Sequence, residues 1–374
     1  MNRPWSMVPL RELLTPVSRP EAVDPQKTYH ILGAHWYAKG LYTKDIKSGS
    51  QIQAKNLYRA EHGDFVYNRL FAWKGSFAVA SEENHGCYVS NEFPCFLVNQ
   101  NRIDRRYLWR YFSRAGIWEE AFGLSTGGTP TSRNRLKEDK LLAMKMPLPP
   151  VEEQRRTVAK IDNLAAKIKE VRGLRESAME KADALLPRSR AAEFMVLADH
   201  FPNLPLDKLI SMASGEGLTS SQMDDAAPYP VYGGGGLTGR YSQYLFEEPK
   251  IAIGRVGARC GCVFVTEPKS WITDNALYLT EISADLHPPY LVHALSTLDI
   301  RQQANQAAQP VVSQKKINPL TIPVPPIAEQ QRIVGELDAL QAEISSLRHM
   351  QAQTAAELDA LLPSILDKAF KGEL

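Results

Sequence analysis

The sequence predicts a mixed α/β protein in which two dissimilar domains are connected by two long helices that pair as a coiled coil. Three observations carry this prediction: an internal repeat, helical apolar spacing within each copy of the repeat, and strand-like composition in the blocks between the copies. The chain has 374 residues, which is enough for two or three domains, and its 44% apolar content can give each of them a core.

The internal repeat begins at a proline cluster. Residues 147–158, PLPPVEEQRRTV, match residues 323–334, PVPPIAEQQRIV, so the offset is 323 − 147 = 176 residues. The same offset places Phe194 on Phe370 without a gap. The chain therefore divides into a first block at 1–146, a first repeat at 147–203, a second block at 204–322 and a second repeat at 323–374.

Each repeat predicts a long helix directly after its prolines. Residues 147–150 and 323–326 should be extended, because proline fixes φ and lacks the N–H that a helix interior needs. Apolar and small residues then recur at alternating spacings of three and four, which is a heptad seam. Pro187 and Pro363 are expected to end or kink the helices. The seam residues are Val158, Ile161, Ala165, Ile168, Val171, Arg175, Ala178, Ala182 and Leu185 in the first repeat, and Val334, Leu337, Gln341, Ile344, Leu347, Gln351, Thr354, Leu358 and Leu361 in the second. A helix that lies on the core of its own domain is the alternative interpretation of each seam.

The two blocks are rich in Gly, Pro, aromatic and β-branched residues, which predicts short strands and turns. Residues 63–69 and 75–79 have the pattern of a strand, a turn and a strand, and residues 249–255 and 260–265 have the same pattern. A third short segment and a helix are expected afterwards, at 86–91 and 105–113 in the first block and at 270–275 and 289–298 in the second. Both blocks therefore predict the same kind of mixed α/β domain.

Positive charge is concentrated in the first block. Residues 1–146 hold 21 Lys and Arg against 14 Asp and Glu, a net charge of 21 − 14 = +7, whereas the whole chain has +2. Phosphate binding needs a local basic surface, and Arg133, Arg135 and Lys137 follow a Gly-rich loop at 125–130. A solvated charged face is the alternative interpretation of these residues.

Motifs for catalysis, cofactors and metals are incomplete. The GGGLTG run at 234–239 has the letters of a dinucleotide loop, but no helix start follows it, so we expect a turn. The HPPY run at 287–290 is similar to the D/N-P-P-Y of adenine methyltransferases, but a His replaces the acceptor side chain, so we expect a proline turn before a helix. Cys260 and Cys262 have no second pair at zinc-like spacing. The sequence thus predicts no catalytic and no metal site, no membrane span and a cytoplasmic location.

Taken together, these motifs resemble the specificity subunit of type I restriction–modification enzymes. The two P-x-P-P-x-x-E-Q helices and the ending LDKAFKGEL at 366–374 are similar to that family, and so are the short runs YGG, IGR and WIT at 232–234, 253–255 and 271–273. The resemblance covers essentially the whole chain. It implies two target-recognition domains, each reading one half of a bipartite DNA site, separated by an antiparallel coiled coil that acts as a ruler.

Candidate site residues follow from this resemblance and from the chemistry of side chains. Arg and Lys suit phosphate and guanine, and Gln suits adenine. The candidates for DNA binding are Arg69, Lys74, Arg133, Arg135, Lys137, Arg255, Arg259, Gln309 and Lys315. Residues repeated at the two helix starts could dock two copies of one partner, and they are Gln154, Arg156, Gln330 and Arg332.

The resemblance also implies partners and cofactors. They would be double-stranded DNA, two methyltransferase subunits that bind S-adenosylmethionine, and restriction or translocase subunits that bind ATP and Mg²⁺, with no cofactor on this chain. A specificity subunit of a combined restriction–methylation system without a separate motor shares every feature above. A coiled-coil scaffold that does not bind DNA is an alternative of a different class. A stand-alone enzyme is a third alternative, which the missing motifs disfavour.

Overall fold

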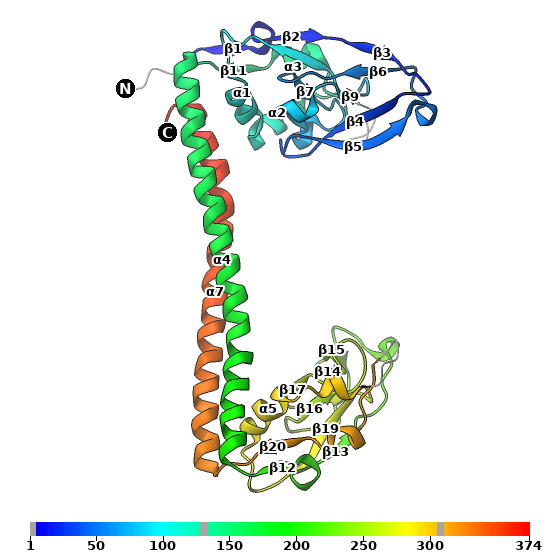
Figure 1. Cartoon of the computed structure of the whole chain (residues 1–374), viewed down its shortest axis with the longest axis vertical. Coiled ribbons are helices and arrows are strands. Elements are labelled where there is room, and N and C mark those ends of the chain that lie inside the picture. The colour runs from blue at the N-terminus through cyan, green and yellow to red at the C-terminus, as the bar shows by residue number, and fades with distance from the viewer. Residues whose placement is uncertain (1–4, 128–133, 305–309) are drawn as a thin grey trace. The chain divides into compact units, whose positions relative to one another are not determined.

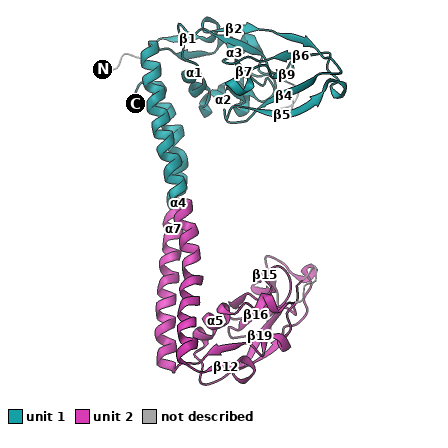
Figure 2. Ribbon diagram, in the orientation of Figure 1, with its two compact units in different colours: residues 1–174, 352–374 teal, residues 175–351 magenta. Residues whose placement is uncertain are grey.

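The computed structural model describes residues 5–127, 134–304 and 310–374. They form two compact units, one of residues 1–174 with 352–374 and the other of residues 175–351 (Figure 2). Two long helices, α4 (Val151–His200) and α7 (Ile327–Lys371), each contribute one part to each unit (Figure 1). The first unit is therefore built from both ends of the chain.

The described residues of the first unit form three sheets and three short α-helices besides its parts of α4 and α7. The sheets have the orders β1-β11, β2-β10-β7-β8 and β3-β6-β9-β4-β5. The strands are β1 (Met7–Pro9), β2 (Leu14–Val17), β3 (Pro20–Ala22), β4 (Thr28–Ala34), β5 (Leu41–Ser48), β6 (Asn56–Arg59), β7 (Phe65–Tyr67), β8 (Phe77–Val79), β9 (Tyr88–Val89), β10 (Cys95–Val98) and β11 (Lys145–Pro147), and the helices are α1 (Arg105–Phe112), α2 (Ala115–Leu124) and α3 (Glu138–Ala143).

The second unit repeats this plan with fewer strands. Its sheets have the orders β12-β20, β13-β19-β16-β17 and β15-β14-β18. The strands are β12 (Asn203–Pro205), β13 (Ile210–Ser214), β14 (Tyr229–Gly233), β15 (Gly236–Tyr241), β16 (Ile251–Gly254), β17 (Val263–Val265), β18 (Trp271–Ile272), β19 (Ala276–Ile282) and β20 (Thr321–Pro323), and the helices are α5 (Pro288–Thr297) and α6 (Gln314–Ile317).

Corresponding strands pair in the same way in the two units. An antiparallel pair leads into each long helix, β1 with β11 and β12 with β20. The four-stranded sheets are antiparallel throughout and have equivalent orders. The third sheets differ, because a parallel pair and a hairpin recur in both but β3 and β6 extend the sheet of the first unit only. The two units thus share their strand pairs and four-stranded sheets but differ in their third sheets.

The predicted strands and helices of the blocks are confirmed. The antiparallel pairs β7–β8 and β16–β17 form where the sequence indicated strand, turn and strand. Helices α1 and α5 begin within one residue of the expected positions. Asp104 caps α1, since its carboxylate accepts hydrogen bonds from the backbone N–H groups of Arg106 and Tyr107. The GGGLTG run forms the expected turn of the β14–β15 hairpin, and it also contributes to the second strand, which was not expected.

The two long helices run antiparallel. Ion pairs and hydrogen bonds join them at successive levels, and the partner's number falls along α7 as the number rises along α4. These contacts are Lys160 to the Leu374 carbonyl, Arg172 to Asp359, Arg175 to the Gln351 carbonyl, Asp183 to Arg348 and Glu193 to Arg332. The predicted coiled-coil pairing is confirmed within each unit.

The predicted seam is buried only in part. Val158 and Ile161 are buried because they belong to the core of the first unit, and Ile168 is buried one to two turns further along α4. Val171 and Leu185, further along, remain 44% and 46% exposed. A single partner helix covers only a narrow stripe, so the seam prediction is wrong for the middle of α4.

The two prolines do not end the helices, so of the two expected outcomes, an end or a kink, the first is excluded. Pro187 lies inside α4, and Pro363 lies inside α7. A proline removes one backbone hydrogen bond and crowds the carbonyl four residues earlier, so an isolated helix bends or stops there. Here side-chain contacts between the two helices lie one turn before each proline. Asp183, four residues before Pro187, accepts from Arg348 at 2.6 Å, and the equivalent Asp359 accepts from Arg172 at 2.7 Å.

Candidate nucleic-acid and partner interfaces

Three of the candidate cations in the first unit lie on one surface between β7 and α3. Arg69 follows β7, and its guanidinium donates to the Asn91 carbonyl and to the Glu138 carboxylate. Arg135 donates to Glu92 at 2.5 Å, and Lys137 is exposed next to it. Acids of the same unit thus already neutralise Arg69 and Arg135 in part. Arg133 lies outside the described residues.

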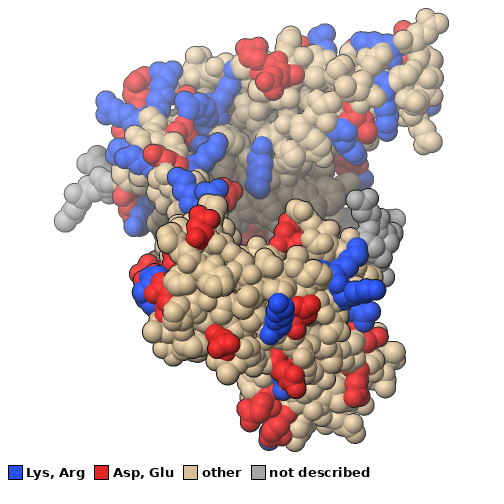
Figure 3. Space-filling view, turned by 60° about the horizontal axis from the view of Figure 1, so that its bottom comes forward, with Lys and Arg blue, Asp and Glu red and all other residues tan. Residues whose placement is uncertain are grey.

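Pairing of this kind is widespread in the unit. Arg102, Arg106 and Arg114 also contact carboxylates. On the face drawn in Figure 3, Lys and Arg side chains stand among Asp and Glu side chains, not in one continuous basic area. The net charge of the first block therefore overstates the cations that are free for phosphate.

Lys74 is the remaining candidate among the described residues of the first unit, and its surroundings are aromatic. It ends a short 3-10 helix, and its Nζ lies 3.9 Å from the ring centroid of Trp36 and 5.0 Å from that of Trp73. Among the described residues it forms no ion pair. Among the described residues, no carboxylate thus pairs with Lys74, unlike Arg69 and Arg135.

In the second unit, two of the candidates, Arg255 and Arg259, adjoin residues that line a glycine-rich cleft of about 380 Å³. Arg255 follows β16 and donates to the Ser214 hydroxyl at 3.3 Å, while its buried Nε has no hydrogen-bond partner among the described residues. Arg259 is exposed on the same loop, with its aliphatic part against Gly235. Lys315 is exposed on α6, which follows the bridge between Val256 and Val311. Gln309 lies outside the described residues.

The glycines shape this cleft by allowing backbone to touch backbone. A Cβ at Gly234 would lie 2.4 Å from the Val256 carbonyl oxygen, and a Cβ at Gly254 would lie 2.0 Å from the Gly234 carbonyl oxygen. No other residue fits at either position without displacing a strand. The loops that carry Arg255 and Arg259 are therefore held close to the β14–β15 turn.

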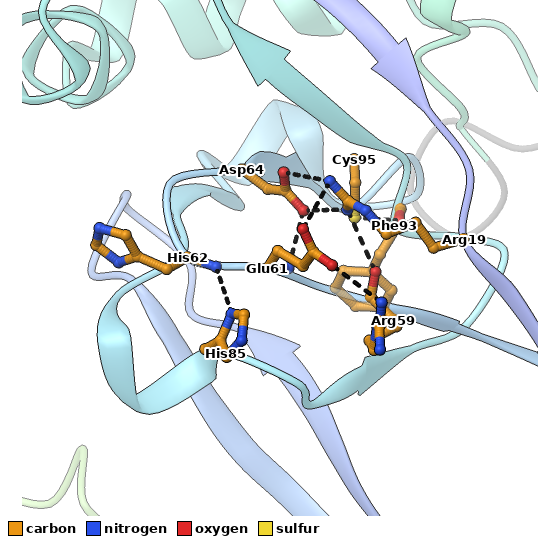
Figure 4. A network of polar contacts seen from close by, with 8 residues as sticks. All are labelled: Arg19, Arg59, Glu61, His62, Asp64, His85, Phe93 and Cys95. Carbon is orange, nitrogen blue, oxygen red and sulfur yellow. Dashed lines mark hydrogen bonds and ion pairs between the residues drawn. The ribbon is translucent and has the colours of Figure 1, made fainter.

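A polar network beside β6 and β7 is structural (Figure 4). Arg19 donates to both oxygens of Asp64, at 2.6 and 3.2 Å, and Asp64 is only 2% exposed. The hydrogen bond to Asp64 raises the pKa of Arg19. Burial raises the pKa of the neighbouring Cys95 thiol to about 12, so this thiol is protonated at neutral pH and is a poor nucleophile.

The two repeated glutamines join each long helix to the domain before it. Gln154 is fully buried, accepts from the Asp104 N–H at 2.8 Å and donates to the carbonyls of Arg102 and Pro149 at 2.9 and 2.8 Å. Gln330 is equally buried and makes the same three bonds, with the His287 N–H and the carbonyls of Asp285 and Pro325. Neither side chain reaches solvent, which corrects the expectation that they offer a surface to a partner.

The two repeated arginines are on the surface. Arg156 is 76% exposed and pairs loosely with Glu153 at 3.8 Å. Arg332 is 45% exposed and contacts Glu193, Glu329 and Glu336. A docking role at the helix starts thus remains a proposal for these arginines only.

Replacing Gln154 by Ala is expected to lower the stability of the first unit by at least about 1–3 kcal/mol, because one N–H and two carbonyls lose their partner in a buried place. A thermal melt of the full chain measures this. Arg156→Ala, two residues away on the exposed face, should change stability by less than about 0.5 kcal/mol. Equal melting temperatures for the two variants would contradict the assigned role of Gln154.

Through one aspartate, each long helix makes further polar contact with the domain before it, and these contacts were not predicted from the sequence. Asp162 accepts from Arg106 and Arg110 of α1, and the equivalent Asp338 lies 3.1 Å from His293 of α5. Burial lowers the pKa of His293. Asp162 and Asp338 are separated by 338 − 162 = 176 residues, the offset of the internal repeat, and this was the signal that could have marked them.

The aromatic residues that the repeat marked also close the two cores. The Phe370 ring packs on Tyr107 and Tyr111, with centroids 4.8 and 5.3 Å apart. The equivalent Phe194 stacks on Tyr290 at 5.2 Å. The end of α7 thus packs on the domain from which α4 starts, and the end of α4 packs on the domain from which α7 starts.

The described part of the chain holds no group of three or more His, Cys, Asp or Glu side chains placed to bind a metal ion. Within the same residues, no helix combines the length and the apolar character that crossing a membrane requires. Burial also raises the pKa of the Cys260 thiol.

Known proteins are similar to this chain over parts of its sequence. Residues 205–354 match the family model described as type I restriction modification DNA specificity domain. A segment of 146 residues, 38% of this chain, is 25% identical to the type I restriction enzyme EcoprrI specificity subunit of Escherichia coli. A segment of 65 residues, 17% of this chain, is 35% identical to the EcoDI specificity subunit of Escherichia coli. These segments span 36% and 15% of the two relatives' own lengths.

Two solved structures share the fold over the whole chain. The HsdS subunit from Thermoanaerobacter tengcongensis aligns with a TM-score of 0.69 and 22% identity, over 100% of this chain and 98% of that one. A structure described as showing complex assembly and conformational transition of the type I R-M system aligns with a TM-score of 0.73 and 23% identity, over 100% and 99%. The arrangement of two sheet-rich domains and long helices is thus that of HsdS subunits.

Proposed function

We propose that this chain, which carries a type I restriction modification DNA specificity domain at residues 205–354 and has the fold of HsdS subunits throughout, recognises DNA for a type I restriction–modification complex. Each unit would read one half of a bipartite site in double-stranded DNA. The curated relatives are named as specificity subunits of type I restriction enzymes, which supports this role.

The observation that carries the proposal is that the two units share most of their structural elements but differ in their third sheet. Both units contain the buried glutamine at the helix start, the strand pair that leads into the helix and the four-stranded sheet. The third sheet has five strands in one unit and three in the other. Such a design keeps the attachment constant while the surface that meets the DNA changes, as two different half-sites require.

The helices supply the surface for partners. Several apolar side chains on α4 and α7 are about half exposed or more: Val171, Leu174, Leu185, Met350 and Leu361. Exposed apolar residues along paired helices suit a protein partner. Because the two units share most of their structural elements, we infer that two copies of one methyltransferase subunit dock on this chain, with Arg156 and Arg332 at the edges of the contact.

Chemistry would come from these partners. S-adenosylmethionine would bind the methyltransferase subunits, and ATP with Mg²⁺ would bind restriction or translocase subunits if they are present. This chain would supply recognition and assembly without catalysing a reaction, and it would meet its DNA in the cytoplasm.

Methylation mapping tests the proposal. The chain is expressed together with a type I methyltransferase subunit from the same genome, and methylated adenines are located genome-wide. We expect one asymmetric, bipartite motif with a fixed spacer, and no methyl transfer by either protein alone. Methylation by the pure chain would show an enzyme. A complex that forms but does not bind DNA would show a scaffold.

A further inference from the structure

The loop between β4 and β5, residues 35–40, carries exposed aromatic side chains, and we call it the aromatic loop. Trp36 is 42% exposed and Tyr37 is 54% exposed. Tyr42 follows at the start of β5, with its ring across Gly33 and stacked on His35 at a centroid distance of 4.2 Å. Large rings of this kind are usually buried, so their exposure on one loop needs an explanation.

The backbone of the aromatic loop is strained and firmly held. Tyr37 and Ala38 have φ of 61° and 52°, a left-handed conformation that side chains with a Cβ rarely adopt. The N–H of Tyr37 donates to the Lys74 carbonyl at 2.8 Å, and the N–H of Ala38 donates to the Gly75 carbonyl at 2.6 Å. Trp109 of α1 donates to the Ala38 carbonyl at 2.9 Å. Strain that the surroundings maintain in this way is typical of functional loops.

The rings of Trp36 and Tyr37 have packing partners within the first unit although both are partly exposed. Tyr37 packs on Trp118 of α2 at 5.5 Å, and Trp36 packs on Phe71 at 5.8 Å. Lys74 covers the ring of Trp36 at 3.9 Å. These contacts fix the direction of Trp36 while leaving much of its surface in solvent. The side chain is therefore presented in one orientation before any ligand arrives.

Positive charge surrounds the aromatic loop. Lys39 lies within it and Lys44 lies on β5, and both are exposed. Among the described residues, neither of them nor Lys74 forms an ion pair. Protein–protein interfaces are enriched in aromatic residues but depleted in lysine. Rings next to unpaired lysines instead fit a nucleic acid, which offers bases for stacking and phosphates for the ammonium groups.

We propose that the aromatic loop opens one base step of the DNA and that Trp36 stacks on the base it exposes, while Lys74 and Lys39 contact the adjacent phosphates. This inference rests on the proposed function, and it assigns to the first unit a contact that depends on DNA deformability more than on base-edge hydrogen bonds. A step that unstacks easily would thus be favoured at this position of the half-site.

The test uses the full chain assembled with its methyltransferase subunits. A 2-aminopurine is placed in turn at each position in and beside the half-site that the first unit reads, except at the adenines that are methylated, because a methyltransferase turns its target base out of the helix by itself. Its fluorescence rises where a base loses a stacking neighbour, which identifies the base across the opened step from the one that stacks on Trp36. We expect a rise at one position with the wild-type complex. Trp36→Ala should abolish that rise and weaken DNA binding by between about 5-fold and 150-fold, whereas Trp36→Phe should keep most of both.

Two further variants separate the contributions. Lys74→Gln should lower the salt dependence of binding by about one ion equivalent without removing the fluorescence signal. Tyr244→Ala is the matched control, because Tyr244 is an exposed ring in the second unit with Lys269 5.9 Å from its centroid. It should leave the signal in the first half-site unchanged. Thermal melts check that each variant is folded.

Each other outcome is decisive. Sequence-specific binding with no unstacked base would overturn the inference and leave the proposed function intact. A Trp36→Ala variant that loses methyltransferase subunits while binding DNA normally would identify the loop as a protein contact instead. A wild-type complex without any sequence-specific binding would overturn the function and the inference together.

Discussion

Removing residues 352–374 is expected to unfold the first unit while the second unit stays folded. The removed segment carries Leu366, Ala369 and Phe370, which are buried in the core of the first unit. It also carries Asp367, which pairs with Arg114 at 2.9 Å. Without it, the rings of Tyr107 and Tyr111 lose the side chain that covers them.

A single substitution should also destabilise the first unit, by less than the truncation does. Phe370→Ala should cost the first unit about 3–5 kcal/mol, because a large buried ring is replaced by a cavity. Phe194→Ala is the matched control, since Phe194 occupies the equivalent place against Tyr290 in the second unit.

Tryptophan fluorescence distinguishes the two variants. Five of the six tryptophans, Trp5, Trp36, Trp73, Trp109 and Trp118, belong to the first unit. A melt followed by fluorescence should therefore shift strongly with Phe370→Ala and weakly with Phe194→Ala. If the truncated chain kept the fluorescence transition of the full chain, the last helix would not be part of the first unit.

Lengthening both long helices is expected to lengthen the spacer of the DNA site. Both helices run from one unit into the other, and Arg175 donates to the Gln351 carbonyl at the level where the units divide. Four helix-forming residues inserted after Leu174 and four after Gln351 would add about 6 Å to each helix. Since DNA rises about 3.4 Å per step, the spacer should grow by one or two base pairs.

The inserted residues also rotate each helix, in an amount close to the twist of one DNA base pair. Four residues turn a helix by about 40° beyond one full turn, and one base pair turns DNA by about 34–36°. The half-sites should thus stay near the faces that read them, and the bases within each should not change. Genome-wide methylation mapping measures the spacer.

An insertion in α4 alone is the control, because it leaves one turn unpaired and should lower stability. An active double-insertion variant that keeps the original spacer would show that the helices do not set the distance between the half-sites.

Local features of the fold could be predicted because neighbouring residues decide them. The proline clusters and heptad spacing placed the helix starts at Val151 and Ile327, and alternating apolar residues placed the strand pairs β7–β8 and β16–β17. The Gly-rich run of β14 and β15 was predicted as a turn because the residues of a dinucleotide site were missing next to it.

The candidate site was predicted less well, because the availability of a side chain depends on distant partners. Arg69 and Arg135 have the charge that phosphate needs, but Glu138 and Glu92 already contact them. Lys74 was predicted for its charge alone, since Trp36 reaches it only through a fold that brings residues 36 and 74 together.

By itself, the sequence determined the repeat, the type and place of most elements, and the resemblance to specificity subunits. Only the tertiary structure decided which helix end belongs to which unit, since Phe370 meets Tyr107 across more than 260 residues of chain. It also decided that Gln154 is buried and that α4 continues through Pro187. The reason is physical. Spacing and propensity act within a few residues, whereas burial, ion pairing and tolerance of a helix proline depend on which segments pack together in space.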